Sequence, residues 1–148
     1  VTAGFNADRH NDRRLASYRG GSPAETLDRF RRIVDSRTAA SGHLPAWLGE
    51  IVVHGQDIRQ PLGLPRTPPV SAVTPVAEFF ASRNFTVNSR TAAAGLRLEA
   101  TDGSFVTGEG PVVTGSTLAL TMAMAGRSDY ADELRGPGAA TLRERLPA

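Results

Sequence analysis

Apolar and polar positions divide the chain into a helical N-terminal part and a C-terminal part that contains strands. In residues 1–20 a few apolar positions stand among many charged ones, at Phe5, Leu15 and Tyr18. This pattern predicts a polar helix with a thin apolar edge. Two consecutive glycines, Gly20 and Gly21, are expected to end it.

A second helix is predicted to begin at Ser22-Pro23. Serine is a preferred N-cap residue, proline is favoured at the first helical position, and Glu25 stands where it can close a capping box. We expect this helix to reach about Ala40. Its expected buried stripe consists of Leu27, Phe30, Ile33 and Val34.

A third helix is predicted from Leu44 to Gln60, because Pro61 and a following glycine interrupt the pattern. At 100° per residue, four of its side chains fall in one narrow stripe that we expect to be buried. These residues are Trp47, Ile51, His54 and Ile58. His54 is therefore expected to point inward, with Glu50 and Asp57 on the flank of the stripe.

The remaining pattern predicts one more helix and then a small mixed region. Thr74-Pro75 is expected to begin a helix that carries Val76, Phe79 and Phe80. Residues 96–101 alternate between apolar and polar, which predicts a strand, and Val112-Val113 predicts a second one. Helices are expected over 116–127 and after residue 138. The fold class is therefore predicted as α+β, with a helical bundle over residues 1–88 and a small α+β domain over residues 89–148.

Composition and charge narrow the classes of function. The chain has 148 residues, 40% hydrophobic and 22% charged, and neither a membrane-spanning apolar run nor a secretory signal is visible, so we expect a cytoplasmic protein. Its formal net charge is only +2, and its arginines alternate with acids around one helix, so neither nucleic acid nor a membrane is an expected partner. Because cysteine is absent, any thiol chemistry requires an external thiol.

The candidate chemistry lies in the third helix, where Glu50 and His54 stand four residues apart. Side chains at this spacing lie above one another on a helix, so both can contact one metal ion if a third ligand comes from elsewhere. Asp57 lies beside the same face. The spacing alone is also typical of a surface pair or of a hydrogen-bonded core histidine.

The segment from Trp47 to Pro65 reads W-L-G-E-I-V-V-H-G-Q-D-I-R-Q-P-L-G-L-P. It resembles the mycothiol-dependent maleylpyruvate isomerase family, which belongs to the DinB-like metal-binding helical bundles. The C-terminal residues, including the L-R-L-E-A-T-D strand and the G-P-G-A-A-T-L segment, resemble the C-terminal domain of that family in order and spacing.

The resemblance implies a divalent metal, usually zinc, held by a histidine of an earlier helix together with Glu50 and His54. It further implies that Asp57 fixes the imidazole of His54 and that Arg127 binds a substrate carboxylate. The earlier histidine has no counterpart after Val1, so we expect the chain to be N-terminally shortened. We therefore consider two substitutes for the missing ligand, His43 and His10. The missing helix would also have covered apolar surface on the helices that carry Phe30 and Trp47, so we expect a homodimer or an aggregation-prone protein with low metal affinity.

The function implied by the resemblance is that of a zinc-dependent enzyme with mycothiol as thiol cosubstrate. It would isomerise a small electrophilic, carboxylate-bearing substrate such as maleylpyruvate, or transfer the thiol to it. The alternative is a non-catalytic domain with an incomplete metal site that binds a small ligand or forms oligomers. In that case the positive charge of Arg127 would only interact favourably with the negative end of the helix dipole, at the C-terminus of a helix.

Overall fold

The computed structural model describes residues 6–37, 43–64 and 66–147. It confirms the α+β fold class, because several helices accompany one three-stranded sheet. The chain divides into two compact units, Val1–Ala40 and Ser41–Ala148, and each is described by itself. No helix of the described residues combines the length and the apolar character needed to cross a membrane.

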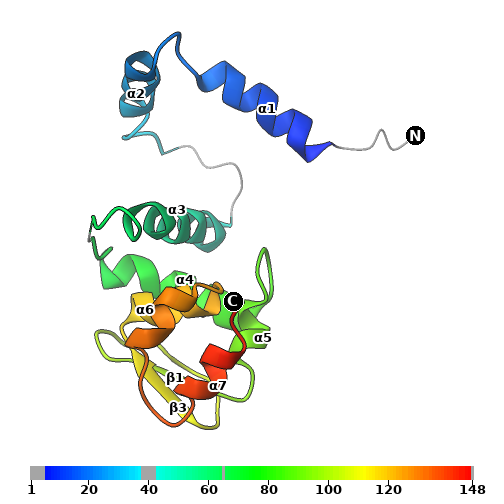
Figure 1. Cartoon of the computed structure of the whole chain (residues 1–148), viewed down its shortest axis with the longest axis vertical. Coiled ribbons are helices and arrows are strands. Elements are labelled where there is room, and N and C mark those ends of the chain that lie inside the picture. Colours follow the sequence, from blue (N-terminus) through cyan, green and yellow to red (C-terminus); the bar gives the residue numbers. More distant parts are fainter. Residues whose placement is uncertain (1–5, 38–42, 65, 148) are drawn as a thin grey trace. The chain divides into compact units, whose positions relative to one another are not determined.

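The first unit contains helices α1 (Ala7–Tyr18) and α2 (Pro23–Arg32) (Figure 1). The predicted start of α2 is confirmed, because the Ser22 hydroxyl accepts a hydrogen bond of 3.1 Å from the backbone N–H of Glu25. The Glu25 carboxylate accepts from the backbone N–H of Gly21 instead of the N-cap N–H of a standard capping box.

Two predictions about α2 were wrong. The helix ends at Arg32 and not near Ala40, and it has no buried residue, so the expected stripe that includes Phe30 is exposed. The physical reason is size, because two short helices offer too little surface to enclose a core of their own. Residues 38–42, over which the helix was expected to end, lie outside the described residues.

The second unit begins with helices α3 (Leu44–Arg59), α4 (Val70–Ser82) and α5 (Ser89–Ala93). α3 has the predicted bounds to within one residue. α4 begins four residues earlier than predicted, so that Pro75 lies inside the helix. This extension brings Val73 into the core, where it is almost completely buried, and we infer that its burial offsets the cost of an internal proline.

The sheet consists of β1 (Arg97–Ala100), β2 (Val106–Thr107) and β3 (Val112–Gly115) in the order β2-β1-β3. β1 pairs with β3 in parallel and with β2 antiparallel, and Leu98 lies opposite Val113 and Thr107. Both predicted strands are confirmed. β2 was missed because two residues are too short to establish an alternating pattern.

Helix α6 (Thr117–Met124) lies at the centre of the core, and all of its residues are buried. It packs against α4, the sheet and the 3₁₀ helix η1 (Ser128–Glu133), while α7 (Ala139–Glu144) covers β3 and η1 (Figure 1). The predicted helices after residues 115 and 138 are thus confirmed. Residues on both sides of the boundary expected after residue 88 contribute to this one core, for example Val76 and Leu120.

The buried face of α3 is not the one that the sequence predicted. α3 packs on α4 through its small and medium-sized residues, which are Gly49, Val52, Val53 and Gln56. The predicted stripe faces outward, and Ile51 is 71% exposed. Because α3 is apolar on two opposite sides, its periodicity alone cannot select the side that is buried.

This assignment of faces can be tested with two truncations, measured in a chelating buffer. Val52→Ala should lower the free energy of unfolding by about 1–2 kcal/mol, because it removes buried methyl groups and leaves a cavity. Ile51→Ala should change it by less than about 0.5 kcal/mol, as an exposed substitution does. Urea unfolding followed by circular dichroism measures both values. A larger effect for Ile51→Ala would mean that α3 is buried through the other face.

Candidate functional site

The three side chains that the sequence singled out on α3 lie together. The Nε2 atom of His54 is 3.2 Å from Oε2 of Glu50, and the Nδ1 atom is 3.0 Å from Oδ2 of Asp57. The helical spacing of three and four residues accounts for both contacts. The expectation that His54 points inward was wrong, because its side chain is 61% exposed.

Arg127, which follows the end of α6, reaches the same group. Its Nε and Nη2 atoms donate to the two carboxylate oxygens of Asp57, at 3.0 and 2.7 Å. Its Nη1 atom donates to the backbone carbonyl of Ala125 at 2.6 Å. In this structure the carboxylate held by Arg127 is that of Asp57, a pairing across 70 positions that no local sequence signal could have predicted.

The ion pair between Asp57 and Arg127 changes the pKa values of both groups. The hydrogen bond from Arg127, together with the contact from His54, lowers the pKa of Asp57 below its ordinary value despite partial burial. The same hydrogen bond raises the pKa of Arg127. Each ring nitrogen of His54 lies within hydrogen-bond distance of a carboxylate oxygen, so the imidazole can donate a hydrogen bond to Asp57 through Nδ1 or to Glu50 through Nε2.

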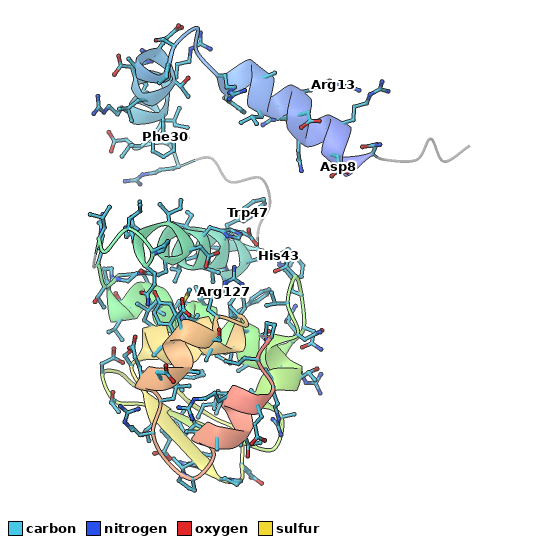
Figure 2. All side chains as sticks on the ribbon, in the orientation of Figure 1. Asp8, Arg13, Phe30, His43, Trp47 and Arg127 are labelled. Atoms are coloured by element: carbon cyan, nitrogen blue, oxygen red, sulfur yellow. The ribbon has the colours of Figure 1, made fainter. Side chains whose placement is uncertain are left out.

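Glu50, His54 and Arg127 line one cavity of about 350 Å³. Its remaining wall is mostly apolar and comes from four places, which are α3 itself, α4, the segment before α5 and the end of α6. These lining residues are Gly49, Val53, Phe80, Thr86, Val87 and Ala125. Figure 2 shows Arg127 on the side of α3 that faces α6. The contribution of the segment before α5 was missed, since neither a motif nor a periodicity marks it.

The cavity continues into a wider groove of about 1150 Å³ along α5 and the C-terminal residues. Val87, Ala125 and Arg127 belong to the linings of both spaces. Arg127 therefore lies where the smaller cavity meets the wider groove.

The distance between the two candidate metal ligands is suitable for a divalent ion. Donor atoms that bind one tetrahedral zinc at their usual bond lengths are separated by about 3.4 Å, and Nε2 of His54 lies 3.2 Å from Oε2 of Glu50. Among the described residues, however, no group of three His, Asp or Glu side chains could hold a metal. The donors thus fit a metal in kind and spacing but supply only two ligands.

His43, one of the two substitutes considered for the third ligand, does not complete the set. His43 is the N-cap residue of α3. Because it precedes Glu50 by seven positions, it lies about 10 Å from it along the helix axis. His10 belongs to α1 in the other unit.

Comparisons with protein-family models, with curated proteins and with solved structures found no match to this chain. The chemistry of the site is therefore argued from its own residues.

The pair of Asp57 and Arg127 predicts a pH-dependent contribution to stability. Because the pKa of Asp57 is lowered by folding, the pair stabilises the fold above the ordinary pKa of an aspartate, about 3.9, and this stabilisation is lost as the pH falls through the lower folded-state pKa. Arg127→Lys keeps the charge but loses the two-pronged geometry. It should cost about 1 kcal/mol at pH 7 and progressively less below pH about 4.

Urea unfolding over this pH range measures the cost, and an NMR titration of the Asp57 carboxyl should show its pKa rising in the variant. Arg31→Lys is the matched control, since Arg31 and Asp28 form an exposed pair with a distance of 3.3 Å. An equal cost at all pH values would show that Arg127 stabilises the fold without the help of Asp57.

Proposed function

We propose that this chain belongs to a metal-dependent, mycothiol-using isomerase or thiol transferase that acts on a small electrophilic carboxylate such as maleylpyruvate. One observation carries the proposal: the two candidate metal ligands, Glu50 and His54, line the same cavity as a carboxylate-binding side chain, Arg127. We expect this chemistry to take place in the cytoplasm, with neither nucleic acid nor a membrane as partner.

Glu50 and His54 are the residues that would hold the ion, for which we propose zinc. When bound, a zinc ion with an open coordination position would lower the pKa of a thiol and hold it as the nucleophilic thiolate. With the ion bound, Asp57 would accept a hydrogen bond from Nδ1 of His54, which lies 3.0 Å from its Oδ2 atom, and would so keep Nε2 available as a ligand. Because the chain has no cysteine, the thiol must come from a cosubstrate.

Arg127 can bind a substrate carboxylate without releasing Asp57. Its three hydrogen bonds to Asp57 and Ala125 use three of the five N–H groups of a guanidinium. The apolar side chains of Val53 and Phe80 provide a surface for the carbon chain of the substrate. A volume of about 350 Å³ is at the small end of the range for ligand pockets, which suits a short dicarboxylic acid.

A second candidate function is non-catalytic binding of a small acidic ligand. The observation that favours it is the set of only two metal ligands in the described residues. Arg127 and the apolar wall would still bind a carboxylate in that case. Metal content separates the two candidates, because only the enzyme requires zinc.

His54 provides the direct test of metal binding. After removal of metal, zinc titration by calorimetry should give a binding signal that His54→Ala lowers at least tenfold in affinity, because one of two ligands is lost. The free energy of unfolding without metal should change by less than about 0.5 kcal/mol, since the side chain is mostly exposed. Replacement of the exposed Phe85 by Ala is the control. Large destabilisation without a change in zinc binding would make His54 a purely structural residue.

The catalytic proposal is tested with the zinc-loaded chain, mycothiol and maleylpyruvate. We expect conversion to the trans isomer, or a stable thiol adduct, that requires both zinc and mycothiol. Glu50→Gln should lower the rate at least a hundredfold, whereas Arg127→Lys should mainly raise KM, because it weakens carboxylate binding. Zinc binding without conversion of this or any related unsaturated acid would favour the non-catalytic alternative.

A further inference from the structure

The wider groove beside the cavity has a lining of its own. Its residues come from four segments of the second unit, which are the segment that contains α5, the end of α6, the start of η1 and the residues after α7. At about 1150 Å³ the groove exceeds the cavity of about 350 Å³ more than threefold, so a short dicarboxylic acid would fill little of it. The groove therefore has room for a second and larger molecule.

Polar side chains line this groove on three of the four segments. They are Asn88 and Thr91 from the segment of α5, Ser128 and Asp129 from η1, and Arg145 from the end of α7. Asn88 is the N-cap residue of α5, but its side chain makes no capping hydrogen bond. An asparagine at an N-cap usually accepts a hydrogen bond from the first turn of its helix, so here the amide can instead bind a ligand in the groove.

Arg145 fixes one wall of the groove. Its Nη1 atom donates to the backbone carbonyls of Ala92 and Ala94, at 2.8 and 2.7 Å. These hydrogen bonds hold the end of α7 beside the end of α5 (Figure 1). They use two of the five N–H groups of the guanidinium, so its Nε and Nη2 atoms can still donate to a ligand.

The charges and the side-chain types of the lining narrow the class of ligand. Arg145 and Asp129 carry opposite charges, and Arg127 is paired with Asp57. The lining thus lacks the excess of one sign that attracts a polyanion. None of the described residues that line the groove is aromatic, whereas nucleotide bases are usually bound by stacking on aromatic rings. Hydroxyl groups, which both donate and accept, match this mixture of donors and acceptors.

Aliphatic side chains complete the lining, among them Met124, Leu146 and Pro147. The C–H faces of a saturated ring can pack on such side chains while the hydroxyl groups of the ring reach the polar ones. Val87 and Arg127 line both the groove and the cavity. A molecule bound in the groove can therefore extend into the cavity.

We propose that the groove binds the hydroxyl-rich, uncharged body of the thiol cosubstrate, whose sulfur end passes Arg127 into the cavity. This inference rests on the proposed function, which requires a thiol from outside the chain. Asp129 favours hydroxyl groups over anionic thiols, because a carboxylate accepts hydrogen bonds from hydroxyl groups and repels other carboxylates. The hydrogen-bonding residues of the groove are Asn88, Ser128, Asp129 and Arg145.

The experiment uses the full chain in a chelating buffer, so that its result does not depend on zinc. One probe is S-methylmycothiol, in which the thiol is blocked and the remainder is uncharged and rich in hydroxyl groups. The other is S-methylglutathione, which carries a net negative charge. In two-dimensional NMR titrations, S-methylmycothiol should shift the backbone amide signals of Asn88, Ser128 and Asp129 until they saturate. S-Methylglutathione should bind at least tenfold more weakly.

Asp129→Ala removes the carboxylate from the groove. The affinity for S-methylmycothiol should fall about tenfold, because a hydrogen bond to a charged group is lost, and the preference over S-methylglutathione should shrink. Glu133→Ala is the matched control, because Glu133 is also an exposed acid of η1 but is not among the described residues that line the groove. It should bind both probes as the parent does.

The outcomes separate this inference from the proposed function. If the zinc-loaded chain converts maleylpyruvate with mycothiol but S-methylmycothiol does not bind at these residues, the groove assignment is overturned and the proposed function stands. If S-methylmycothiol binds and Asp129→Ala weakens it, but the zinc-loaded chain is inactive, the groove assignment is supported and the catalytic proposal fails. Equal affinity for the two probes, or an unchanged affinity of Asp129→Ala, would overturn this inference.

Discussion

The second unit depends on the complete burial of α6. A helix that is apolar on every side is stable in water only if other elements cover all of it. α4, the sheet, η1 and α5 do so, and this requirement fixes their places around it. Arg127 follows directly after this buried helix and its turn. The packing of α6 therefore also determines where Arg127 lies.

The candidate site depends on this position of Arg127. Arg127 reaches α3 from the end of α6, and its guanidinium donates two hydrogen bonds to the carboxylate of Asp57. Asp57 in turn contacts His54, which contacts Glu50. A partly buried cation thus contacts the first of three linked side chains on α3, and the last two, His54 and Glu50, line the cavity. The core and the candidate chemistry are linked by one ion pair.

α3 has two apolar faces that differ in the size of their side chains. The face with Gly49 and Val53 is narrow enough to pack closely on α4, where the ring of Phe80 approaches the glycine. The outer face carries larger side chains, such as Ile51 and Ile58, that the rest of the second unit leaves exposed.

Local signals in the sequence determined much of the secondary structure. The serine and proline at the start of α2, the alternation in β1 and the buried run of α6 are readable because capping, strand period and continuous hydrophobicity involve residues close in sequence. The spacing of Glu50, His54 and Asp57 likewise predicted that these side chains meet, since a helix sets their distances. Tertiary structure alone decided which face of α3 is buried on α4 and which carboxylate Arg127 binds. Those outcomes depend on what packs against each helix, and contacts between residues far apart in the chain leave no periodic trace in a single sequence.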